Sequence, residues 1–276
     1  MAKPKEFHKY LIDSSSKNHV TQEDYLNSPA CAFLKYVIEA KDAVELCKNK
    51  FPKNQNGTYS SDSLASIQHI TAAMIPAIMG HFETFQRYLF AGMFENSVYL
   101  QKFDVGIFLN NLKKEINLEI DVARLSSYRG SNISVGLLLA DNLNNWQWGE
   151  KVNKYFGCFG LKNAAGHTQS FYSNDDKERS AVLWQLRNSI VHTGGTITRP
   201  DAQKVKNLHE YGDKQIVFQN TIIYEIARKL HPLIKNSTFR MKDIYLHNLR
   251  NDIEVTTRKK IEDMFKVSST ASVWLR

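Results

Sequence analysis

Apolar residues recur at intervals of three and four along most of this chain, which is the spacing of one face of an α-helix. The pattern is clearest at 31–47 and returns at 64–94, 105–125, 175–192 and 217–234. Alternation with period two, which would indicate strands, extends over only a few residues at a time. The sequence therefore predicts an all-α protein.

The composition is that of a globular protein, with 42% hydrophobic and 23% charged residues. The three cysteines form no Cys-x-x-Cys pair, so we predict neither a disulfide framework nor a thiolate zinc site. We also find no signal peptide and no run near the ~20 apolar residues that span a bilayer, since Pro76 interrupts the best one. We therefore expect a cytoplasmic protein with no membrane contact. The net charge of +8 suits a polyanionic partner and equally an ordinary soluble surface.

The segment RNSIVHTGG, residues 187–195, holds the side chains best suited to chemistry. It closes a predicted helix that begins at a cap residue, Ser173 or Asn174. Gly194 or Gly195 supplies the left-handed residue that ends the helix.

A helical wheel divides this helix into two faces. The apolar stripe, which we expect to face the core, consists of Leu183, Leu186 and Ile190. Asn188 and His192 stack on another side, Trp184 lies next to them, and Arg187 lies on the border. A tryptophan outside its own subunit's core indicates a second surface, most simply the same helix of another copy. In such a dimer, the Arg187 and His192 pairs would meet in one cleft able to bind a phosphate and move a proton.

Arg187, Asn188 and, after three further residues, His192 resemble the signature of HEPN domains, all-helical domains in which Arg, a polar residue and His end a core helix. The resemblance covers about residues 64–234. It implies a HEPN-like bundle at 61–235, with an N-terminal helical extension and loop at 1–60 and a charged, mostly helical tail at 236–276. It also implies a metal-independent, dimeric endoribonuclease that serves as a toxin or in defence against phage.

The resemblance also implies a mechanism. His192 would act as general base on the ribose 2′-OH or protonate the leaving 5′-oxygen, while Arg187 would stabilise the transition state and Asn188 would orient His192 or a phosphate oxygen. RNA products would carry a 2′,3′-cyclic phosphate, and DNA would resist cleavage. The expected partners are RNA and a second copy, with an antitoxin or regulatory protein as a further candidate and no cofactor. Some family members have a Tyr two residues after the His, but here that residue is Gly194, so no role is carried over.

Two alternatives stay open at this point. In the first, His192 interacts with the dipole of its own helix and Arg187 belongs to a surface ion pair. In the second, the chain is a non-catalytic HEPN-like module that binds RNA, a nucleotide or a protein. The spacing alone decides nothing, because Arg240 and His247 also fit the loose motif, although Met241 follows that Arg.

A few other residues are candidates for a site. Glu83, beside His81, could line the same cleft or be a solvated surface residue. The histidines show no zinc spacing, so we predict no metal site. Trp146 and Trp148, in the turn NNWQWGE, could stack on bases or pack against the protein.

Overall fold

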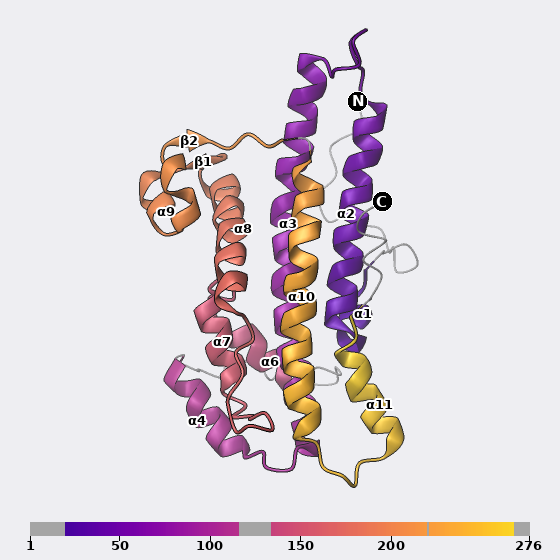
Figure 1. The fold of residues 1–276 in the computed structure, drawn as a ribbon, viewed down its shortest axis with the longest axis vertical. Coiled ribbons are helices and arrows are strands. Elements are labelled where there is room, and N and C mark those ends of the chain that lie inside the picture. The colour runs from indigo at the N-terminus through magenta and orange to yellow at the C-terminus, as the bar shows by residue number, and fades with distance from the viewer. Residues whose placement is uncertain (1–19, 116–133, 220, 268–276) are drawn as a thin grey trace, which may run out of the picture.

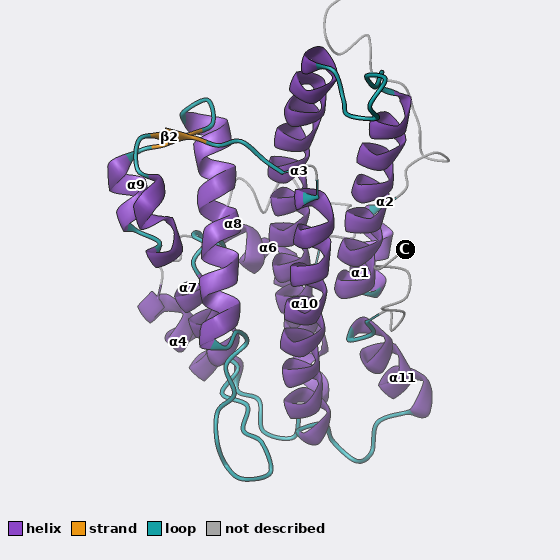
Figure 2. Cartoon of the chain, turned by 45° about the horizontal axis from the view of Figure 1, so that its top comes forward, coloured by secondary structure: helices purple, strands orange, loops and turns teal. Residues whose placement is uncertain are grey.

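The computed structural model describes residues 20–115, 134–219 and 221–267, and it confirms the prediction of an all-α protein (Figures 1 and 2). The helices are α1 (Gln22–Asn27), α2 (Pro29–Lys50), α3 (Ser61–Glu95), η2 (Asn96–Tyr99), α4 (Val105–Glu115), α6 (Val135–Asn142), α7 (Gly149–Gly157), α8 (Asn174–His192), α9 (Arg199–Gln203), η3 (Lys206–Tyr211), α10 (Ile222–His247) and α11 (Val255–Met264). Within these ranges the strands are β1 (Thr196–Ile197) and β2 (Lys214–Gln215), which pair antiparallel.

Helix α3 is the central rod of the molecule, with α2, α6 and α8 packed along it (Figure 1). Its 35 residues make it about 52 Å long. Ser60 caps the start of this helix, because its hydroxyl accepts a hydrogen bond from the Ser63 amide. The helix continues through Pro76 without a break.

One helix of the described residues, Ser61–Tyr99, is long and apolar enough to cross a membrane, judged by length and composition only. The sequence analysis predicted that no apolar run is long enough to span a bilayer, because Pro76 interrupts the best one. In the structure the helix continues through Pro76. The helix packs against α2, α6 and α8, and its buried side chains include Phe82, Phe85 and Leu89. Of the most apolar stretch of this helix, 33% is buried inside the described structure.

One hydrophobic core holds the bundle together. It contains Phe33 and Val37 of α2 together with α3, α8 and α10 residues, so α2 belongs to the bundle rather than to an extension. The predicted boundary after residue 235 falls inside α10, where Ile234 and Met241 on either side of it are both buried. The part of α10 that follows residue 235 therefore belongs to the core and is not a separate tail.

The helix predicted at 105–125 is observed from Val105 to Glu115, and the rest of that range lies outside the described residues. Helix α6 is capped by Ser134, whose hydroxyl accepts a hydrogen bond from the Leu137 amide.

Helix α8 begins as predicted at Ser173, whose side chain forms a reciprocal capping box with Asp176. The chain after α8 folds back as β1, α9, η3 and β2, and this lobe lies against the outer side of α8 (Figure 1). Its small core of Ile197, Ala202 and Leu208 contacts Val182 and Leu186 of α8. Helix α8 is therefore covered on two sides, by the main core and by this lobe.

We predicted one buried face and one exposed face for α8, and the contacts on two sides show that this is wrong. The stripe of Leu183, Leu186 and Ile190 is only partly buried, although it does pack against the core. The buried positions are instead Asp176, Ser180, Trp184, Gln185 and Ser189. The polar side chains among them find local partners, as when Gln185 Nε2 donates to Ser189 Oγ at 3.2 Å.

Candidate functional site

The predicted motif lies at the end of α8, where the helix stops at Thr193 and the double glycine follows. Both glycines are left-handed, with φ of 61° at Gly194 and 89° at Gly195, which a residue with a side chain adopts only at a cost. The Gly195 amide donates to the Ser189 carbonyl at 2.9 Å, so the chain turns sharply away from the helix. This turn leaves the imidazole of His192 exposed at the helix end.

The structure brings Arg187, Asn188 and His192 together. Arg187 Nη1 donates to Asn188 Oδ1 at 3.0 Å and lies 3.5 Å from His192 Nε2. We predicted a direct contact between Asn188 and His192. In the structure both residues instead contact the Arg187 guanidinium, which lies between them. Asn188 thus positions Arg187, which the sequence did not indicate.

The Arg187 guanidinium keeps donors for a ligand. Its N–H groups on Nε and Nη2 have no protein partner in the described part of the chain. A guanidinium presents these donors in a planar fork that matches two oxygens of a phosphate. The end of α8 can therefore bind a phosphodiester and place a His within reach of it.

A groove adjoins the motif, and we call it the Trp148 groove. It has a volume of about 440 Å³ and lies between α8, the turn before α7 and α9. Neutral side chains that line it include Gln147, Trp148, Trp184, Gln185 and Asn188, and the charged ones are Lys177, Glu150, Asp201 and Lys204. Because Asn188 lines the groove and also bonds Arg187, the groove and the motif share a wall.

The two turn tryptophans, which the sequence did not distinguish, have opposite roles. Trp146 is 1% exposed, and its Nε1 donates to the Ala140 carbonyl at 3.2 Å. Trp148 is 56% exposed and lines the groove. The sequence left stacking and packing open for both residues, and only burial by distant segments separates them.

The structure corrects the predicted environment of Trp184. We predicted that it lies outside its own subunit's core, but it is 6% exposed and its ring centroid is 6.2 Å from that of Phe82. The wheel failed because it assumed a single buried face on α8. Because Trp184 is buried in its own subunit, it gives no evidence for a dimer interface.

Glu83 has an ion-pair partner on its own helix. Its carboxylate accepts a hydrogen bond from Arg87, which also bonds Asp141 of α6 at 3.1 Å. Within the described residues, no contact joins Glu83 to Arg187 or His192. Glu83 thus links α3 to α6 through Arg87.

The second copy of the loose motif is structural. Arg240 Nη2 donates to Asp176 Oδ2 at 2.7 Å, and its Nε and Nη2 both donate to the Phe171 carbonyl. The Asp176 side chain is 5% exposed, so this ion pair is largely buried. Arg240 therefore anchors the start of α8 to α10.

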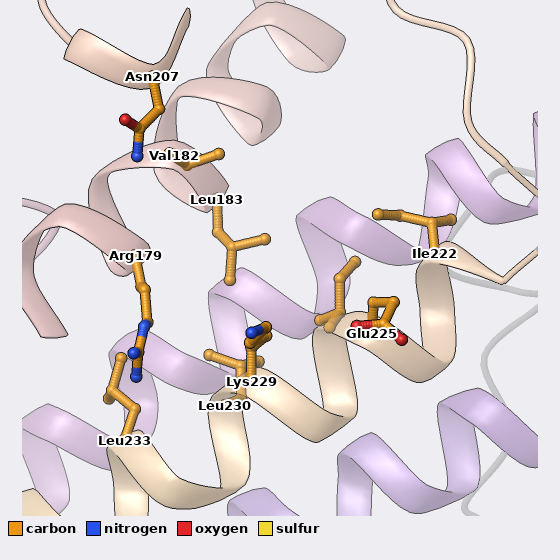
Figure 3. Close-up of a pocket in the computed structure, with 10 residues that line it drawn as sticks. Arg179, Val182, Leu183, Asn207, Ile222, Glu225, Lys229, Leu230 and Leu233 are labelled. Carbon is orange, nitrogen blue, oxygen red and sulfur yellow. The ribbon is translucent and has the colours of Figure 1, made fainter. Parts of the chain in front are cut away.

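A second groove lies between α8 and α10 and does not involve the motif. Figure 3 shows Leu183 of α8 and Leu230 and Leu233 of α10 pointing into it, with Arg179 alongside. Its volume is about 250 Å³. None of Arg187, Asn188 and His192 lines this groove.

No family model matches this chain, no curated protein is similar to it, and no solved structure is similar to it. The arrangement of the residues themselves is thus the basis for assigning a function. Across the ranges that the structure describes, no three His, Cys, Asp or Glu side chains are grouped so that they could hold a metal ion.

Proposed function

We propose that this protein is a metal-independent endoribonuclease of HEPN type that acts as a homodimer. The observation that carries the proposal is the convergence of Arg187, Asn188 and His192 at the exposed end of α8. Cleavage of RNA by its own 2′-OH needs a group that transfers protons near neutral pH and a cation at the phosphate. His192 and Arg187 supply these two groups.

The proposed reaction is a transphosphorylation. A His192 imidazole removes the proton from the 2′-OH, and the 2′-oxygen attacks phosphorus. The bond from phosphorus to the 5′-oxygen breaks, and that oxygen takes up a proton. The products are a 2′,3′-cyclic phosphate and a 5′-hydroxyl. Arg187 binds the non-bridging oxygens, whose negative charge grows in the transition state.

The dimer follows from the proton balance. One neutral imidazole accepts a proton but has none to give in the same step, whereas two imidazoles, one protonated, provide a base and an acid. Because such an enzyme would damage cellular RNA, we expect it to act as a toxin or an effector of defence against phage.

The test is cleavage of end-labelled RNA in EDTA by the wild-type chain, Arg187→Ala and His192→Ala. We expect both substitutions to lower the rate by on the order of 10²- to 10⁴-fold. His247→Ala is the matched control, because His247 is an exposed histidine of the second, structural motif. Cleavage that persists in both motif variants contradicts the proposal. Binding of RNA without cleavage supports the non-catalytic alternative instead.

Mixing wild-type chains with an excess of the His192→Ala variant tests the shared cleft. A mixed dimer keeps only one His192 imidazole and so lacks the pair of base and acid, and we expect the activity per wild-type chain to fall as the variant is added. Sedimentation of the wild-type chain should show a dimer. A strictly monomeric, active wild-type protein would contradict both the homodimer and the transfer of protons by two His192 imidazoles.

A further inference from the structure

The Trp148 groove has the chemistry of a site for a flat, neutral, polar ligand. Its charged side chains already pair with one another, Lys177 with Glu150 at 2.5 Å and Lys204 with Asp201 at 2.7 Å. Hydrogen bonds from Lys204 and Thr198 lower the pKa of Asp201, which keeps that carboxyl charged at neutral pH. Because these cations are compensated, the groove is poorly suited to a phosphate chain.

The neutral side chains of the groove offer the complementary features. The exposed indole of Trp148 presents a face for stacking, and base stacking on aromatic side chains is a general mode of RNA recognition. Gln147 and the Asn188 Nδ2 atom form no hydrogen bond with the rest of the described chain. An aromatic face with free amide groups matches a nucleobase, whose edge carries donors and acceptors.

The backbone of Trp148 is fixed although its indole is exposed. Trp148 directly precedes α7, its amide donates to the Asn145 carbonyl at 3.0 Å, and its carbonyl accepts from Val152 at 3.0 Å. Gly149 lets α7 approach α8, since a Cβ there would lie 2.7 Å from the Lys177 side chain. Because the backbone at Trp148 is already ordered, only the two side-chain torsions of the indole remain to be fixed when a ligand binds.

The groove is also correctly placed for the reaction. Asn188, in its wall, bonds Arg187, and His192 lies one helical turn further along α8, about 6 Å away. We infer that the Trp148 groove binds one unpaired nucleobase of the RNA next to the scissile phosphate, with Trp148 stacking on it. This inference rests on the proposed function, and it makes single-stranded RNA the substrate class.

The test uses the full chain and 2′-O-methyl RNA hexamers of A, C, G or U, which lack the nucleophile and cannot be cleaved. Binding is followed by fluorescence anisotropy of the labelled hexamer and by quenching of tryptophan emission. For the hexamer that binds best, we expect Trp148→Ala to raise Kd by about 5- to 150-fold. Trp148→Phe, which keeps a ring, should stay within about fivefold of wild type.

The matched control is Phe239→Ala, which truncates another exposed aromatic residue on α10 and should leave Kd unchanged. RNA should quench the wild-type emission, and Trp148→Phe should lose that quenching. An unchanged Kd in Trp148→Ala, or no binding of any hexamer by the wild-type chain, overturns the inference.

Cleavage assays separate this inference from the proposed function. If the wild-type chain binds hexamers through Trp148 but cleaves no RNA, the ribonuclease proposal fails and the base site stands. If the wild-type chain cleaves RNA and Trp148→Ala cleaves it with unchanged KM and kcat, the base site fails and the ribonuclease stands.

Discussion

Nη1 of Arg187 lies 3.0 Å from Oδ1 of Asn188 and 3.5 Å from Nε2 of His192, so one guanidinium nitrogen joins the two other motif residues. The arrangement orients Arg187 before any ligand binds, which lowers the entropic cost of binding. It also distinguishes Arg187 from Arg240, whose donors are taken up by the Phe171 carbonyl and Asp176.

Replacing Arg187 by Lys tests the need for a planar fork. A lysine keeps the positive charge but cannot bond Asn188 and two phosphate oxygens in fixed geometry. We expect Arg187→Lys to lower the rate of RNA cleavage by on the order of 10²-fold, with the free energy of unfolding within about 0.5 kcal/mol of wild type. Both are measurable, by single-turnover kinetics and by urea titration. A fully active Arg187→Lys enzyme would show that charge alone suffices.

Trp184 is expected to stabilise the fold and not the dimer. Because its indole is 6% exposed against Phe82, Trp184→Ala should lower the free energy of unfolding by about 3–5 kcal/mol. Trp184→Phe, which keeps an aromatic ring, should cost less and leave the sedimentation coefficient unchanged. A dissociated but fully stable Trp184→Phe protein would restore the interface role that the sequence suggested.

Arg240→Ala should destabilise the protein without a specific effect on catalysis. The substitution leaves the Asp176 carboxylate, 5% exposed, without its cation, and loss of one partner of a buried pair costs about 3 kcal/mol. Arg258→Ala is the matched control, since Arg258 forms an exposed pair with Glu262 that contributes less than about 0.5 kcal/mol. Urea unfolding curves give both values, and equal effects would contradict the assigned role.

His81 should make stability depend on pH. Its Nδ1 lies 2.8 Å from the Tyr25 hydroxyl, its ring stacks on Tyr36, and burial lowers its pKa below the usual 6.5. The unfolded chain therefore binds a proton more readily, so this contribution is complete above pH 6.5 and is lost as the pH falls through the folded-state pKa.

The measurement is the urea midpoint between pH 7.5 and pH 5, compared with His81→Gln, which cannot titrate. We expect the wild-type midpoint to fall more steeply than that of the variant. Glu45 and Glu115 do not interfere, because their pKa values are lowered from 4.5 and they contribute to pH dependence only in more acidic solution. Parallel curves would exclude His81 as the source.

Much of the local structure followed from the sequence. The helical class, the cap at Ser173 and the stop at the double glycine depend on residues close together in the chain, and all three are observed. The spacing of the motif also placed its side chains at one helix end. Local interactions fix these features, so a short stretch of sequence contains the information.

Burial could not be predicted in the same way. A helical wheel tells which residues share a side, but the segments that cover each side come from elsewhere in the chain. The lobe of β1, α9, η3 and β2 covers α8 at Val182 and Leu186, and Phe82 of α3 lies against Trp184. The polar Ser189 is also buried. The sequence by itself determined the helices, their caps and the spacing of Arg187 and His192. Only the tertiary structure decided that Trp184 belongs to the core and Trp148 to an open groove, because exposure depends on contacts between residues far apart in sequence.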